Sequence, residues 1–205
     1  MTHDPEGYRE SMREFRKRLG ILNDVLLPFV SAGVVAIPNC ELAALQLRKM
    51  YELIGFASLS ANRHRYVVLR KRYEKDWNLA EILVRIEKVN PAFLPIGLDE
   101  TYAAGTSAAP HILRTKGSRI DKTLLLEHHG RLANLLHARN PYRPELDYEW
   151  WHGWLQQRAR ELVETLELHT VAIEYQKTIY RVALRDAETD DVSVTVMNFN
   201  LVSGQ

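Results

Sequence analysis

The sequence has little that marks an exported or a membrane-spanning protein. Cys40 is the single cysteine among 205 residues, which excludes a disulfide within the chain and a zinc site built from several cysteines, and which is typical of a reducing compartment. No stretch approaches the ~18 consecutive apolar residues of a membrane span, and residues 1–6 lack the basic and apolar regions of a signal peptide. We therefore expect a cytoplasmic protein with no membrane partner.

An excess of one charge is also lacking. The chain holds 27 Lys and Arg against 26 Asp and Glu, a net charge of +1, so any binding of nucleic acid must come from a local basic patch. No glycine-rich phosphate loop, Gly-x-Ser-x-Gly turn or cysteine–histidine nucleophile pair is present, and we expect no cofactor. What remains is an ordinary globular composition, 46% hydrophobic and 26% charged, enough for one domain with a packed core.

The spacing of apolar residues predicts five helices. The first begins at Asp4-Pro5-Glu6 and is ended by Pro28 and Gly33, and the others cover about 39–62, 76–89, 120–138 and 145–168. The first helix carries a narrow apolar seam, made of Tyr8, Met12, Phe15, Leu19, Leu22, Leu26 and Phe29. Such a seam contacts either an antiparallel neighbour in a bundle or a second copy of the chain.

After residue 168 the pattern changes to strands. Segments 171–175, 178–185 and 192–196 alternate apolar and polar residues, with a turn at 186–191. Three strands alone are barely stable, so they must pack on the helices or pair with another chain. The predicted fold class is mainly α, a bundle of about five helices (1–168) with a small C-terminal antiparallel β-meander (169–205), or α+β. Residues 91–117 show no period and are expected to form a long connection.

The helix at 120–138 carries the residues with the most chemistry. His128, Arg131, Asn134 and His137 follow at steps of three, which places them along one side of the helix before an Asn-Pro pair stops it. Histidine titrates near neutral pH, and arginine grips phosphate oxygens as a bidentate fork. Arg131 and His137 are therefore candidates for acid–base chemistry on a phosphodiester. Alternatively, they are surface or capping residues near a helix C-terminus, where cations are favoured.

Three polar residues share one side of the otherwise apolar helix at 39–62: Glu41, Arg48 and Glu52. Polar side chains on so apolar a helix need partners. They either pair with each other on an exposed strip or face the helix of Arg131 and His137. In the second case Arg48, Glu52 and His128 would support the site.

One segment is strongly basic. It contains Arg63, Arg65, Arg70, Lys71, Arg72 and Lys75, with Tyr66 and Tyr73 between them and Glu74 as the opposing charge. Basic side chains with interleaved aromatic residues can follow a phosphate backbone while stacking on bases, which predicts nucleic-acid binding. The other interpretation is a solvated, charged connection between two helices.

Two motifs suggest a metal, and neither is sufficient. Adjacent His128 and His129 point about 100° apart on a helix. Glu149 and His152 have the Glu-x-x-His spacing of di-iron bundles, but the second motif of such a site is missing. We expect no metal. The tryptophans Trp150, Trp151 and Trp154 are expected to anchor the core or the sheet and not to stack on a ligand.

Arg131 and His137, together with the long helix that ends near Asn62-Arg63-His64-Arg65-Tyr66, resemble the HEPN superfamily. These small helical-bundle proteins share a motif of arginine, a polar residue, a few further positions and histidine. The resemblance covers about residues 39–142 and is to bacterial members. It implies that His137 is the acid–base residue and that Arg131 contacts the phosphate. The residue after the arginine is usually Asn, Asp or His, whereas here it is Leu132, so either Asn134 substitutes for it or the site is inactive.

The resemblance implies a homodimer that binds RNA and cuts it without a metal, in a defence or toxin–antitoxin role. Two chains would then supply two histidines and two arginines to the site. An antitoxin would be a further partner. The alternative is a non-catalytic interaction module of the same fold, which would hold a protein partner through the N-terminal seam or the β-meander.

Overall fold

The computed structural model describes residues 4–26, 37–101, 112–117, 120–138, 140–174 and 178–198. They form six α-helices, one short 3-10 helix and one five-stranded antiparallel sheet. The predicted fold class, mainly α with a C-terminal β-meander, is therefore confirmed. No helix in these ranges is both long enough and apolar enough to cross a membrane.

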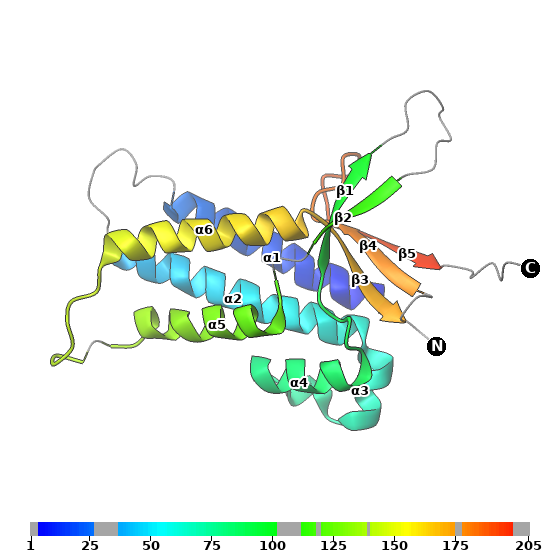
Figure 1. The fold of residues 1–205 in the computed structure, drawn as a ribbon, viewed down its shortest axis with the longest axis horizontal. Helices are drawn as coiled ribbons and strands as arrows, with labels where there is room; N and C mark the ends of the chain where they lie inside the picture. Colours follow the sequence, from blue (N-terminus) through cyan, green and yellow to red (C-terminus); the bar gives the residue numbers. More distant parts are fainter. Residues whose placement is uncertain are drawn as a thin grey trace, which may run out of the picture.

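Helices α1 (Pro5–Leu26) and α2 (Ile37–Ala61) form an antiparallel pair (Figure 1). Asp4 caps α1, as predicted, because its carboxylate accepts a hydrogen bond from the Gly7 N–H at 2.9 Å. The apolar seam of α1 is buried within the same chain, at Tyr8, Met12, Phe15, Leu22 and Leu26. It therefore contacts a bundle neighbour. The predicted seam residue Phe29 and the predicted stops Pro28 and Gly33 lie outside the described residues.

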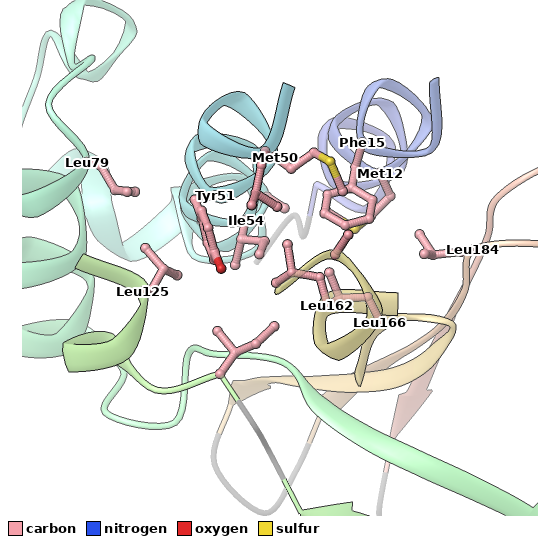
Figure 2. Close-up of a cluster of buried hydrophobic side chains, with 14 of the residues drawn as sticks. Met12, Phe15, Met50, Tyr51, Ile54, Leu79, Leu125, Leu162, Leu166 and Leu184 are labelled. Atoms are coloured by element: carbon pink, nitrogen blue, oxygen red, sulfur yellow. The ribbon is translucent and has the colours of Figure 1, made fainter. Parts of the chain in front are cut away.

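Helix α2 is the centre of the bundle, as its apolar circumference predicts. It contacts α1, α4, α5 and α6. Figure 2 shows Met50, Tyr51 and Ile54 of α2 between residues of α1 on one side and of α4 and α5 on the other. Met12 and Phe15 of α1 and Leu162 and Leu166 of α6 complete this core in the same view.

The basic segment is more ordered than a simple connection. It contains α3 (Arg63–Leu69) and a 3-10 helix (Tyr73–Lys75), and it leads to α4 (Leu79–Val89). With the additional helix α3, the described residues contain six α-helices, whereas the sequence predicted about five. Helix α3 follows α2 directly because Tyr66 is fully buried and anchors it to the core. Helix α4 begins three residues later than predicted, since Asn78 caps it by accepting from the Glu81 N–H at 3.2 Å.

Helices α5 (Lys122–Leu136) and α6 (Tyr148–Leu166) match the predicted helices at 120–138 and 145–168. Each begins at an aspartate that caps it. Asp121 accepts from the Leu124 N–H at 2.8 Å, and Asp147 accepts from the Trp150 N–H at 2.9 Å. The two helices run in opposite directions, so the start of α6 lies near the end of α5 (Figure 1).

The sheet has the order β2-β1-β3-β4-β5. Strands β3 (Leu168–Glu174), β4 (Thr178–Ala183) and β5 (Ser193–Asn198) are the predicted meander. It packs on the helices, where the Tyr8 hydroxyl of α1 lies 2.8 Å from the His169 ring of β3. Arg13 of α1 also donates to Asp191, beside β5, at 3.0 Å.

The prediction that 91–117 is a long connection is wrong for the part of the segment that the structure describes. The segment contributes β1 (Ile96–Thr101) and β2 (Ile112–Gly117), which pair with each other and extend the meander beyond β3. Their order depends on pairing with residues about 70 positions later, such as Ile96 with Thr170. A local sequence pattern does not carry that information. Gly97 allows β1 to pass close to α6, since a Cβ there would lie 3.2 Å from the Thr165 carbonyl oxygen, a tight contact.

Candidate functional site

Two of the three predicted catalytic residues line one pocket. Asn134 and His137 border a pocket of about 500 Å³ beyond the end of α5, and Asn140, Arg143 and Glu145 form further walls. His137 is the residue that ends the helix, where its N–H donates to the Ala133 carbonyl at 3.0 Å. Its side chain is exposed. An imidazole, a guanidinium and a carboxylate therefore share a solvent-accessible hollow.

Arg131 does not line this pocket. Its Nη2 donates to the Glu127 carboxylate at 2.9 Å, and its guanidinium carbon lies 5.9 Å from the ring centroid of Trp154. No hydrogen bond joins Arg131 to His137 among the described side chains. Each step of three residues falls about 60° short of a full helical turn, so two steps leave the two positions about 120° apart. Among the described residues, the arginine that lines the pocket with His137 is Arg143, which no sequence pattern had indicated.

Two stacked tryptophans of helix α6, Trp150 and Trp154, lie beside Arg131. Two guanidinium groups lie near the Trp154 ring, Arg131 at 5.9 Å and Arg158 at 5.8 Å from its centroid, both within the range of cation–π attraction. Trp150 stacks on Trp154 with ring centroids 6.3 Å apart and is 47% exposed. Trp151 is buried in the core, as predicted, whereas the prediction is wrong for the exposed Trp150. The spacing of Trp150 and Trp154, four residues apart, is the signal that could have separated them from Trp151.

We call this surface the α5–α6 face. It consists of Arg131, Trp150, Trp154 and Arg158 together with the pocket of Asn134, His137 and Arg143. Its two parts adjoin on α5, since Asn134 of the pocket lies about one helical turn after Arg131.

His128 supports the face from beneath. Its side chain is buried, its Nε2 lies 3.4 Å from Nη1 of Arg158, which donates, and its Nδ1 is paired with the Tyr51 hydroxyl at 3.1 Å. The ring also meets Trp154 edge to face, with centroids 5.5 Å apart. Burial and the charge of Arg158 lower the pKa of His128, so the ring is neutral at pH 7. This makes it a positioning residue for Arg158 and Trp154.

Arg48 and Glu52 form both of the contacts that the sequence left open as alternatives, an ion pair with each other and contacts with α5. They pair with each other at 3.5 Å and they also face α5, where Glu52 contacts the His129 ring at 2.9 Å and Arg48 donates to the His129 carbonyl at 3.2 Å. The hydrogen bond from His129 lowers the pKa of Glu52. Their α5 partner is thus His129, and they attach α5 to α2. Glu41 is exposed.

Most of the predicted nucleic-acid-binding residues have structural partners. Tyr66 is buried and donates to Asp76 at 2.8 Å, so its ring cannot stack on a base. Arg70 contacts the same carboxylate at 2.8 Å, and Arg65 donates to the Val89 carbonyl at 3.3 Å. Arg63 pairs with Asp4 at 3.2 Å and lies over the Tyr73 ring. In contrast, Lys71, Arg72 and Lys75 are exposed and form no ion pair with another described residue.

The structure separates the basic segment from the pocket. Helix α4 contacts the first residue of α5, where Lys122 pairs with Glu87 (Figure 1). His137 lies just beyond the last residue of α5, at its opposite end. A helix of 15 residues is about 22 Å long. The two groups of predicted site residues are therefore two separate surfaces.

Comparison with known proteins adds no assignment to either surface: no family model matches the chain, and neither a curated protein nor a solved structure matches it. Within the described residues, no group of three or more His, Cys, Asp and Glu is arranged to hold a metal ion.

Proposed function

We propose that this protein binds single-stranded RNA on the α5–α6 face and cuts it there without a metal, as the HEPN resemblance implies. The observation that carries the proposal is the pocket that both His137 and Arg143 line, beside a tryptophan pair in which Trp150 is exposed and Trp154 lies near two arginines. Tryptophan faces stack on bases of any identity, and guanidinium groups hold phosphates.

The residues of the pocket match the steps of RNA cleavage. One group must take the proton of the 2′-hydroxyl while another gives a proton to the leaving 5′-oxygen, and a cation must stabilise the phosphorane between them. His137 and Arg143 supply one proton carrier and one cation. The second proton carrier is either Glu145, which lines the same pocket, or His137 of a second chain in the implied homodimer.

Arg131 can join this chemistry at little energetic cost. Its ion pair with Glu127 links positions four apart on a helix, and both side chains are partly exposed. Pairs of this kind contribute about 0.3–0.5 kcal/mol. A phosphate, which accepts stronger charge-assisted hydrogen bonds from arginine, would therefore displace Glu127.

Binding is tested by fluorescence anisotropy with a labelled single-stranded RNA. We expect Trp150→Ala to weaken binding by about five- to a hundredfold, since stacking on an aromatic ring contributes about 1–3 kcal/mol per base. Arg131→Ala should weaken it and reduce its salt dependence. The matched control is Arg185→Ala, an exposed cation at the turn before β5. Absence of binding at low salt, or an equal effect of the control, contradicts the proposal.

Cleavage is tested separately with cellular RNA in EDTA. We expect the wild-type protein to leave 2′,3′-cyclic phosphate ends and His137→Asn to lose at least about a hundredfold in rate, because it removes an acid–base group. His152→Asn is the matched histidine control, since its ring contacts the Leu26 carbonyl on α1, outside the pocket. Equal RNA profiles for wild type and His137→Asn would remove catalysis and leave binding alone.

One observation favours the second candidate, a non-catalytic interaction module. Strand β5 is the last in the order of the described sheet, and its sequence Ser-Val-Thr-Val-Met-Asn has none of the charged residues or prolines that usually protect an edge strand. An extended partner segment would add to it as a further strand. Native mass spectrometry should then show a complex that Val196→Lys dissolves and His137→Asn does not affect.

A further inference from the structure

The segment between α3 and α4 exposes unusually large apolar side chains. Val68 is 81% exposed, Leu69 49% and Trp77 78%. Exposed cations lie between them in the sequence at Lys71, Arg72 and Lys75. We call these six residues the basic tip. Single exposed apolar residues are common, but a tryptophan and two aliphatic residues within ten positions mark an interaction site.

An internal clasp brings the two ends of the tip together. Asp76, whose side chain is 3% exposed, accepts hydrogen bonds from Arg70 and from the Tyr66 hydroxyl, each at 2.8 Å, and lies 3.3 Å from Arg85. Leu69 precedes Arg70 and Trp77 follows Asp76, so both flank the closed end of the loop, and the lysines and Arg72 lie on the loop between them. The clasp therefore presents apolar and cationic side chains on one ordered projection.

The tip is more basic than the molecule as a whole. In the clasp, Asp76 neutralises the charge of Arg70. The remaining charged residues of the loop are Lys71, Arg72, Lys75 and Glu74, with a net charge of +2, whereas the net charge of the whole chain is +1. Among the described residues, these three cations are also without ion-pair partners. Their charge is therefore available to an anionic partner.

We propose that the basic tip docks on an anionic lipid surface, with Trp77 at the level of the headgroups and Val68 and Leu69 in contact with the upper acyl chains. Tryptophan prefers the interface between membrane and water. Cations near an anionic leaflet each strengthen binding by about fivefold, and exposed aliphatic residues add apolar contact. This is attachment to the membrane surface, which requires no helix that crosses the membrane, and none is found among the described residues.

Other occupants fit these side chains less well. Single-stranded RNA would use Trp77 and the cations but would leave Val68 and Leu69 without a role. A second copy related by a twofold axis would place like charges opposite each other. In addition, α3 and the segment that leads to α4 lie at the edge of the molecule, below the bundle in Figure 1, where a flat surface can reach them.

The test is co-sedimentation of the full chain with vesicles of phosphatidylcholine alone or mixed with phosphatidylserine. We expect binding only to the vesicles with phosphatidylserine, and loss of binding at high salt. The double variant Lys71→Glu, Arg72→Glu should bind at least about tenfold more weakly, because two attractive charges become repulsive. The matched control is the double variant Lys17→Glu, Arg185→Glu, which reverses two exposed cations of α1 and β4–β5.

Tryptophan emission identifies the residue that enters the interface. The vesicles should shift the emission of the wild-type protein to the blue, and Trp77→Phe should remove that shift although the other three tryptophans remain. The proposal is overturned if phosphatidylserine vesicles do not bind, if the tip variants bind as well as the control, or if RNA and not vesicles produces the Trp77-dependent shift. His137→Asn and Trp150→Ala should leave vesicle binding unchanged, so this result is independent of the RNA proposal.

Discussion

His169 shows how burial changes the chemistry of a single side chain. The ring is fully buried between α1 and the end of α6. Because the Leu166 carbonyl only accepts hydrogen bonds, Nδ1 carries the proton and donates to it at 2.8 Å, and Nε2 accepts from the Tyr8 hydroxyl at 2.8 Å. Burial lowers the pKa of His169 to about 4. The ring therefore stays neutral and joins α1 to β3.

We expect this histidine to make the protein less stable in mild acid. In the unfolded chain the ring takes up a proton below pH 6.5, whereas in the folded protein it does so only near pH 4, so between these values the unfolded state binds more protons. The contribution of neutral His169 to the free energy of unfolding is complete above pH 6.5 and falls by up to about 3 kcal/mol toward pH 4. Urea midpoints at several pH values, for wild type and His169→Gln, measure it. Equal pH slopes for the two proteins would contradict the assignment.

The contact between α2 and α4 depends on the absence of a side chain at Gly55. A Cβ at this position would meet Cδ1 of Leu79, a buried residue at the start of α4. Gly20 in α1 is the opposite case, because a Cβ there meets nothing within 4 Å. The two glycines therefore lie in helices for different reasons.

We expect opposite effects from alanine at these two positions. Gly55→Ala should destabilise the fold by about 1–2 kcal/mol, since Leu79 must move within a packed core. Gly20→Ala should stabilise it by about 0.5–1 kcal/mol, because alanine has the higher helix propensity and no neighbour is displaced. Chemical denaturation of both variants measures the difference. A stabilising Gly55→Ala would show that α4 is not packed against α2 as described.

The sheet and the bundle share one apolar core. Val171 and Ile173 of β3 and Tyr180 and Val182 of β4 are buried in the same apolar cluster as α1, α2 and α6. Polar contacts link the same parts, from Tyr8 to His169 and from Arg13 to Asp191. Strands β1 and β2 precede α5 and α6 in the chain, whereas β3, β4 and β5 follow them. The sheet is therefore built from segments on both sides of these two helices.

We therefore expect a single unfolding transition. Amide protons of α2 and of β3 should exchange with the same opening free energy, and circular dichroism should follow the same urea curve as tryptophan fluorescence. Tyr8→Phe should lower both exchange free energies equally, by about 1–3 kcal/mol, since it leaves the buried Nε2 of His169 without its donor. A lower value for β3 alone would instead identify the meander as a separate domain.

The sequence predicted which helix carries the candidate site, but not which side chains lie next to His137. The sequence located His137 and Asn134 at the end of a helix, and the pocket contains both. It paired His137 with Arg131, but the angular drift along α5 turns Arg131 toward Trp154, and Arg143 from the following segment takes the neighbouring place. Periodicity specifies the direction of a side chain to within one face of its helix, which is too coarse to identify contacts.

By itself the sequence determined the elements whose signals are local: the capped start and apolar seam of α1, the apolar α2, the helices α4 to α6 and the alternating strands of the meander. Only the tertiary structure decided that 96–101 and 112–117 are strands, that Tyr66 lies in the core and Trp77 at the surface, and which arginine shares a pocket with His137. The reason is that hydrophobic periodicity and capping act within a few residues, whereas burial and pairing depend on parts of the chain that are distant in sequence and meet only when it folds.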